Sequence, residues 1–207
     1  MIDCLAVPVA TPDQANVAEA QLRVDMLGER LVVDGARGAL TRAGFRRWEA
    51  RNHLIADGRI TPTDMALLRS QTRGGYSVHV NLDRQVMAVH RGGSGVEIKV
   101  STGSGLWYGK PGDVSRAVTP TGSFRATRKI DGMRQSALGC LQRPIYFLRG
   151  WAIHGSNSVP RRPASHGCVR VSMPAAEALF RTVGVGAPIK VSGSNPAPRN
   201  TKGTPVA

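Results

Sequence analysis

WAIHGSNSVPRRPASHGCVRVS, residues 151–172, contains two of the five histidines and one of the three cysteines of this 207-residue chain. These are His154, His166 and Cys168, and Gly167 directly precedes the cysteine. A thiol nucleophile in acyl transfer needs a base that accepts its proton and backbone N–H groups that stabilise the oxyanion. Because Gly167 has no side chain, the backbone there could approach a substrate carbonyl closely. The stretch therefore predicts a cysteine-based active site.

Both histidines are candidates for the base. His166 lies two residues before Cys168, so the two side chains would share a face if this segment is extended. His154 ends an apolar run and would approach the sulfur from a neighbouring strand. Two other interpretations stay open: a zinc site made by these three residues, whose types are suitable ligands, and a buried core cysteine. The chain has no CxxC or HExxH pattern that would supply a ready ligand set for zinc.

This pattern resembles the active-site signature of the YkuD-type L,D-transpeptidases, cysteine enzymes of the bacterial wall. In that family an apolar strand ends in His-Gly, and a variable loop leads to Ser-His-Gly-Cys, an aliphatic residue, and Arg or Asn. Here the two parts read IHG at 153–155 and SHGCVR at 165–170. The family's STG, TPTG and Phe segment is matched at residues 101–124. The resemblance implies a β-rich catalytic domain with a YkuD-like mixed sheet or sandwich.

The resemblance also implies catalytic roles. Cys168 would be the nucleophile and His154 its base, with the backbone carbonyl of Gly155 holding the other ring nitrogen. The N–H groups of Gly167 and Cys168 would form the oxyanion hole, with the N–H of His166 as a third candidate. His166 would otherwise support the loop or contact substrate. An activated Cys168 should then react with iodoacetamide faster than the other cysteines, and at lower pH.

Four further residues are predicted to contact substrate. Arg170 lies two residues past Cys168 and should share its face, where a guanidinium suits the carboxylate of diaminopimelate or of a terminal D-Ala. The alternative is a structural arginine that is paired within the fold. Ser165 is expected to shape the turn or to hydrogen-bond to the pocket, and Gly155 and Tyr146 complete the predicted substrate site.

The chain is strongly basic. Its formal net charge is +14 and its pI is about 11.1, which favours polyanionic partners such as nucleic acid, anionic lipid or an acidic cell wall. The alternative is a dispersed cationic surface with no dedicated anion site. Basic residues occur at most in short clusters and no nucleic-acid-binding motif is present, so a nucleic-acid partner is not expected. Neither a metal nor an organic cofactor is expected.

Three cysteines leave at least one free thiol, and Cys168 is the natural candidate. Cys4 and Cys140 could pair or stay reduced, because sequence alone does not decide between the two states. A wall enzyme must be exported, so we expect a location in the bacterial cell envelope, in the periplasm or the cell wall. The N-terminal residues MIDCLAVPVATPDQA have a short apolar run without a basic region, a poor signal peptide, so the export signal is expected outside this sequence.

The periodicity predicts an α+β protein with two domains. Apolar residues recur at helical spacing over residues 14–27 and 38–52, Thr61-Pro62 starts a third helix, and alternation with period two begins at Tyr76. The three helices resemble a small peptidoglycan-binding domain on the matching residues Thr41, Trp48, Leu54, Asp57, Gly58 and Thr61. The expected organisation is a tail at 1–13, this helical domain at 14–70, a linker at 71–75, the catalytic domain at 76–192, and a disordered tail at 193–207.

The family resemblance implies a monomeric L,D-transpeptidase that binds peptidoglycan stem peptides and glycan. Cys168 would attack a tetrapeptide stem, release D-Ala, and pass the acyl group to another stem in a 3→3 cross-link. Carbapenem β-lactams would acylate the same thiol. Two alternatives remain: an L,D-carboxypeptidase, in which water resolves the thioester, and a non-catalytic wall-binding protein.

Overall fold

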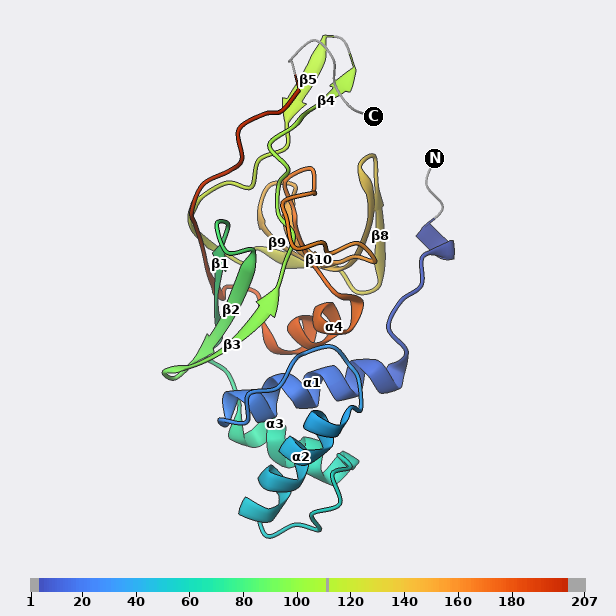
Figure 1. Cartoon of the computed structure of the whole chain (residues 1–207), viewed down its shortest axis with the longest axis vertical. Coiled ribbons are helices and arrows are strands. Elements are labelled where there is room, and N and C mark those ends of the chain that lie inside the picture. The colour runs from blue at the N-terminus through green and yellow to red at the C-terminus, as the bar shows by residue number, and fades with distance from the viewer. Residues whose placement is uncertain (1–3, 111, 201–207) are drawn as a thin grey trace.

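The computed structural model describes residues 4–110 and 112–200, and its N-terminal part is helical (Figure 1). A short 3-10 helix, η1 (Cys4–Ala6), precedes α1 (Pro12–Met26), α2 (Ala39–Arg51) and α3 (Pro62–Gln71). The Thr61 hydroxyl accepts the Asp64 N–H, and the Asp64 carboxylate accepts the Thr61 N–H at 2.8 Å. This capping box and Pro62 in the first turn suit a helix start. The capping box supplies acceptors for N–H groups that would otherwise lack partners, and proline has no N–H that needs one. The predicted start of the third helix is confirmed.

The rest of the chain forms two five-stranded sheets and a hairpin. The first sheet has the order β3-β2-β1-β12-β6, with β1 (Ser77–Asn81), β2 (Val86–Arg91), β3 (Ser94–Lys99), β6 (Gly122–Arg125) and β12 (Pro188–Ser192). The second has the order β11-β10-β9-β7, and β8 also pairs with β9; its strands are β7 (Arg128–Lys129), β8 (Met133–Ser136), β9 (Gly139–Leu148), β10 (Trp151–Gly155) and β11 (Val169–Val171). The hairpin joins β4 (Trp107–Lys110) and β5 (Asp113–Arg116). The protein is therefore α+β, with a β-rich domain that follows a helical region in the chain.

A fourth helix, α4 (Met173–Thr182), packs on β9 and β10 on one side and on α1 on the other (Figure 1). The Ser172 hydroxyl caps it by accepting the Ala175 N–H. Only Ser172 separates this helix from β11, the strand that contains the last two residues of the SHGCVR motif. This connection places a packed helix beneath the candidate active site.

Helix α1 belongs to two hydrophobic clusters. Ala18, Leu22 and Met26 pack into the large core formed by the sheets and α4. Other positions of α1, Val17 and Val24 among them, pack with α2 and α3 instead. Helix α1 has buried apolar residues on more than one side and so completes both cores, while the domain boundary at residues 71–75 stays a prediction.

A buried carboxylate reinforces this contact between the helical and β-rich parts. Glu19 of α1 accepts hydrogen bonds from Arg23 of the same helix, Arg69 of α3 and Arg181 of α4. Burial disfavours its charge, but the three guanidiniums outweigh burial and lower the pKa of Glu19 to about 2. Charge and packing therefore both join α1 to the elements on its two sides.

The predicted tails at 1–13 and 193–207 are structured wherever the structure describes them. Cys4 forms a disulfide with Cys140 at the start of β9. Near the other end, Asn195 exchanges hydrogen bonds with the Thr119 backbone, and Asn200 bonds the Trp107 backbone. In residues 193–200, for which the sequence predicts disorder, the polar side chains of Asn195 and Asn200 pair with loop backbone; residues 1–3 and 201–207 lie outside the described part of the chain.

Removing the Cys4–Cys140 disulfide should lower the free energy of unfolding by about 2–4 kcal/mol, because the cross-link restricts the unfolded chain between residues 136 positions apart. The test is the denaturation midpoint in guanidinium of Cys4→Ser/Cys140→Ser and of the oxidised wild type. Wild-type protein kept in reductant is the matched control and should unfold like the variant. Equal midpoints for the oxidised protein and the variant would contradict a stabilising disulfide.

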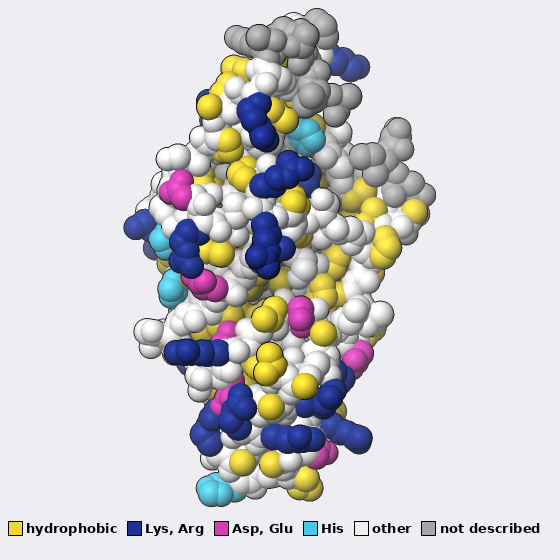
Figure 2. Space-filling view, viewed as in Figure 1, with side chains coloured by type: hydrophobic (Ala, Val, Ile, Leu, Met, Phe, Trp, Pro, Cys, Tyr) yellow, Lys and Arg dark blue, Asp and Glu magenta, His cyan; other side chains and the backbone are white. Residues whose placement is uncertain are grey.

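Positive charge is spread over the surface. Figure 2 shows Lys and Arg side chains scattered over the helices and the sheets of one face, with fewer acidic side chains between them. This face fits the dispersed cationic surface better than one dedicated anion site. In the part of the chain that the structure describes, no helix has the length and apolar character needed to cross a membrane.

Candidate active site

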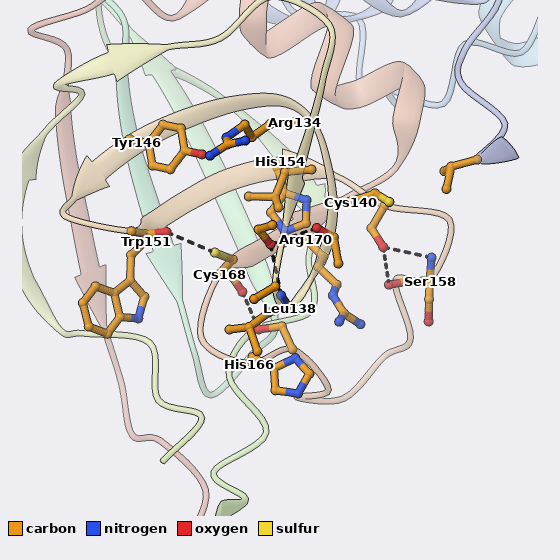
Figure 3. A pocket seen from close by; sticks show the side chains of 18 of the residues that line it. Arg134, Leu138, Cys140, Tyr146, Trp151, His154, Ser158, His166, Cys168 and Arg170 are labelled. Atoms are coloured by element: carbon orange, nitrogen blue, oxygen red, sulfur yellow. Dashed lines mark hydrogen bonds between the residues drawn. The ribbon is translucent and has the colours of Figure 1, made fainter. Parts of the chain in front are cut away.

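A cavity of about 720 Å³ lies beside β10 and the segment before β11, and the β8–β9 hairpin forms one wall (Figure 3). Six predicted site residues line it: Tyr146, His154, Ser165, His166, Cys168 and Arg170. Gly155 and Gly167 do not line it, and they contribute backbone positions instead. Val7 also lines the cavity, so the disulfide-linked N-terminal segment reaches the same site.

Strand pairing brings Cys168 and His154 to this cavity. Strands β10 and β11 are parallel, with Ile153 opposite Val169 and His154 opposite Arg170. Cys168 precedes β11 by one residue, so it lies next to β10. Its thiol donates to the Gly150 carbonyl at 3.7 Å (Figure 3). His154 on β10 and Cys168 just before β11 therefore line the same cavity although they are 14 positions apart in sequence.

His154 is buried, with 6% of its surface exposed. Its Nδ1 lies 2.9 Å from the Gly155 carbonyl oxygen, and because a carbonyl can only accept, Nδ1 carries the proton. The hydrogen bond that the family resemblance implied is therefore present. Burial, opposed by the hydrogen bond to the Gly155 carbonyl and aided by the Arg170 charge, lowers the pKa of His154 to about 4. At neutral pH the ring is uncharged and its Nε2 is available to accept a proton.

The Cys168 thiol is also neutral at rest. Burial raises its pKa, and the Ala152 N–H and the Arg170 charge only partly offset this effect. The expectation of alkylation at unusually low pH is therefore not supported by the environment of the sulfur. The sequence pattern pointed to a histidine near the thiol, but it did not reveal that burial shifts the pKa of both groups.

Alkylation of native Cys168 by iodoacetamide should consequently require higher pH than alkylation of a free cysteine, since the thiolate is the reacting form and its pKa is raised. The measurement is the pH–rate profile by intact mass, and the chain unfolded in denaturant under non-reducing conditions serves as the reference. Cys4 and Cys140 stay silent because they are disulfide-bonded. If the midpoint of the pH–rate profile lay at lower pH for the native protein than for the unfolded chain, the native fold would stabilise the Cys168 thiolate.

The turn before Cys168 is held by one serine. The Ser165 hydroxyl donates to the Cys168 carbonyl at 2.5 Å and accepts the Gly167 N–H at 3.0 Å. This agrees with the role expected for Ser165 in shaping the turn. It corrects the expectation for Gly167, because its N–H is already occupied and is not free for an oxyanion. The N–H groups of Cys168 and His166 remain the candidate donors.

A second layer of hydrogen bonds braces this turn. The Thr119 hydroxyl donates to the Gly167 carbonyl at 2.8 Å and accepts the Gly103 N–H at 2.9 Å. Asn195 holds Thr119 in turn, since its side chain accepts the Thr119 N–H and donates to the Thr119 carbonyl, both at 2.8 Å. The position of the TPTG segment pointed to Thr119. No sequence signal pointed to Asn195, which lies in a segment without periodicity.

Gly167 has a steric role. Its φ is +132°, and a Cβ there would lie 2.7 Å from the Val118 carbonyl oxygen and 2.8 Å from Trp151 Nε1. These two atoms are hydrogen-bonded to each other at 2.9 Å. A side chain would therefore strain the backbone and push the turn away from its support.

The predicted acylation of Cys168 by a carbapenem should be about 100-fold slower in Gly167→Ala, because a displacement of about 1 Å at a reacting group costs that much. The rate of adduct formation by intact mass provides the measurement. Gly184→Ala is the matched control, since a Cβ there meets nothing within 4 Å. If Gly167→Ala were acylated at the wild-type rate, the turn would tolerate a side chain.

The remaining predicted residues differ in their surroundings. Arg170 is partly buried and makes no ion pair with a described carboxylate, so the structural arginine paired within the fold is not observed. The Tyr146 ring is buried, with the Arg128 guanidinium 4.1 Å from its centroid. His166 packs edge-on against Tyr108 with centroids 4.8 Å apart. Gly155 packs on α4, and its carbonyl serves His154.

Potential metal ligands do not gather at the site. Among residues 4–110 and 112–200, no three His, Cys, Asp or Glu side chains lie together as a metal site would require. The zinc alternative therefore has no ligand cluster in the described part of the chain.

The family follows from comparison with known proteins. The model of the YkuD family, the L,D-transpeptidase catalytic domain, matches residues 75–191. The crystal structure of the L,D-transpeptidase (residues 123–326) from Xylanimonas cellulosilytica DSM 15894 is 33% identical in sequence, with a TM-score of 0.56. The similarity covers 90% of this chain and 97% of that one. The chain therefore belongs to the YkuD family of L,D-transpeptidases.

Two further solved structures share less of the sequence. The L,D-transpeptidase from Stackebrandtia nassauensis is 19% identical, over 99% of this chain and 98% of that chain, with a TM-score of 0.50, which indicates a shared fold. L,D-transpeptidase 3 from Mycobacterium tuberculosis, solved with a faropenem-derived adduct, is 18% identical, covering 57% of this chain and 60% of that one, with a TM-score of 0.45. A comparison with curated proteins finds no match.

Proposed function

We propose that this chain is a cysteine L,D-transpeptidase that forms 3→3 cross-links between peptidoglycan stems through a thioester. The observation that carries the proposal is the neutral His154, held by the Gly155 carbonyl on the strand beside Cys168 in one cavity. Family membership supplies the reaction class. The cell envelope of a bacterium is the location that this substrate requires.

In the first half-reaction, the Cys168 sulfur attacks the carbonyl carbon of the third, L-linked residue of a tetrapeptide stem. The thiol proton passes to His154 Nε2, which is unprotonated because Nδ1 bears the proton. The amide bond to D-Ala breaks, the proton moves from His154 to the departing amine, and a thioester remains. A neutral thiol and a neutral imidazole suit this transfer, because no separated charges need to be buried at rest.

The oxyanion formed in this step needs a backbone donor. With the Gly167 N–H bound to Ser165, we assign this role to the Cys168 N–H. Such a donor contributes about 2.7–4 kcal/mol in comparable enzymes. The hydrogen bonds from Ser165 and Thr119 to the two flanking carbonyls would keep this N–H aimed at the reacting carbon.

Arg170 is proposed to bind a substrate carboxylate. Its guanidinium faces the cavity without an acidic partner, and its charge also lowers the pKa of His154. A carboxylate bound there would gain charge-assisted hydrogen bonds and would place the scissile amide beside Cys168. In the second half-reaction, the side-chain amine of another stem attacks the thioester, and its proton passes through His154 to the departing thiolate.

Purified disaccharide-tetrapeptide incubated with the protein and analysed by mass spectrometry tests this proposal. Dimers that lack one D-Ala are the expected product. Tripeptide and free D-Ala without dimers would instead assign an L,D-carboxypeptidase, in which water resolves the thioester. No product, and no covalent adduct with imipenem, would favour a non-catalytic wall-binding protein and overturn the proposal.

A further inference from the structure

The cavity has an uneven charge. Its lining includes three arginines, Arg128, Arg134 and Arg170, and no aspartate or glutamate. The two histidines in the lining, His154 and His166, both have pKa values lowered by burial, so neither adds charge at neutral pH. The cavity therefore presents three positive charges and no side-chain negative charge to whatever binds in it.

These arginines lack the acidic partners that arginines have elsewhere. Arg84, for example, pairs with Glu97 at 2.9 Å, and Arg143 pairs with Glu177 at 3.1 Å. None of the three cavity arginines makes an ion pair with a described acidic residue. Unpaired guanidiniums in a concave site favour an anionic ligand, because they gain charge-assisted hydrogen bonds on binding without first losing a partner.

The arginines occupy different walls. Arg170 follows Cys168 by two residues on β11, whereas Arg128 lies on β7 and Arg134 on β8. Arg128 is preorganised, since its guanidinium lies 4.1 Å from the centroid of the Tyr146 ring on the facing strand β9. Figure 3 places Arg134 near Tyr146 and on the other side of His154 from Arg170. One carboxylate bound at Arg170 would leave the β7–β8 wall with its own positive charge.

We propose that Arg128 and Arg134 form a second anion subsite, which selects donor stems carrying a second free carboxylate over stems in which that group is a carboxamide. The inference rests on the proposed function, since it concerns the donor of that reaction. A carboxylate accepts two parallel hydrogen bonds from a guanidinium, whereas a carboxamide offers one acceptor oxygen, no charge, and an NH2 group that opposes the donors. The charge of this second carboxyl group is the chemical difference that the subsite reads.

Two synthetic tetrapeptide donors that differ only in carboxylate or carboxamide at the isoglutamyl residue test the inference. The wild type should show a kcat/KM about tenfold or more higher for the carboxylate donor, the scale expected of a charge-assisted contact. The preference should weaken in high salt because the subsite is open to solvent. In Arg128→Gln/Arg134→Gln the ratio should fall close to one, while use of the carboxamide donor changes less than about threefold.

Controls separate the possible failures. Arg134→Gln alone removes an exposed side chain and should lower the preference without loss of fold. Arg59→Gln removes one exposed positive charge from the segment between α2 and α3 and should leave the ratio unchanged. Equal use of both donors by the wild type, or an unchanged ratio in the double variant, would overturn the second subsite while leaving transpeptidation intact. No product from either donor would overturn the proposed function itself.

Discussion

Cys168→Ala should abolish adduct formation with imipenem and reduce cross-linking by roughly 10⁶-fold, the scale that follows removal of a covalent nucleophile. The reason is chemical, because alanine has no atom that can form the thioester. Cys168 is the only free cysteine of the chain, since Cys4 and Cys140 are disulfide-bonded. Intact mass after incubation with imipenem, together with product analysis on tetrapeptide donors, gives the two measurements.

The fold of this variant should be unaffected. The Cys168 thiol makes only weak hydrogen bonds, among them one to the Gly150 carbonyl at 3.7 Å, and alanine keeps its Cβ, so the substitution should shift the melting temperature little. Titration of native protein with a thiol reagent should report one thiol in the wild type and none in the variant. A variant that folds normally and still forms cross-links would exclude Cys168 as the nucleophile.

His154→Gln should lower kcat/KM by about 10²–10⁴-fold, the usual contribution of a general base. Glutamine can still donate to the Gly155 carbonyl, so the substitution tests the base more than the packing. The wild type should lose activity as pH falls through about 4, because the imidazole is protonated below that pKa and can no longer accept the thiol proton. The pH–rate profile should lack this acidic limb in the variant.

The same ring should affect stability in the acid range. In the unfolded chain a histidine binds a proton near pH 6.5, whereas folded His154 binds one only near 4. The unfolded state therefore holds more protons between these values, so the free energy of unfolding declines as pH falls from about 6.5 to 4. His154→Gln should show a shallower decline. Identical pH dependence in both proteins, for activity and for stability, would place the base at another residue.

Local features were predictable from the sequence. The capping box at Thr61 depends on residues three positions apart, and so it forms wherever that helix forms. The alternation that begins at Tyr76 produces β1 with Val78 and Val80 buried. The contact between His154 and the Gly155 carbonyl joins adjacent residues, so a family pattern in sequence implies it directly.

Other features depend on residues that are distant in the chain. Gly167 was expected to donate to the oxyanion, yet the packed turn gives its N–H to Ser165. The bracing of Thr119 by Asn195 joins positions 76 residues apart, and the second segment has no periodic pattern that would mark it. Arg128 was not a candidate, because only strand pairing brings β7 beside Tyr146 and into the cavity.

The sequence by itself determined the residue types of the site, the order of the strands that carry them, and the family to which they belong. Tertiary structure decided the protonation state of the site, because the pKa values of His154 and Cys168 depend on burial and on the Arg170 charge. It also decided that Cys4 and Cys140 form a disulfide, since only folding brings two cysteines 136 positions apart into contact. The local sequence sets which side chains the site contains, and long-range packing sets the solvent exposure and the neighbouring charges of those side chains.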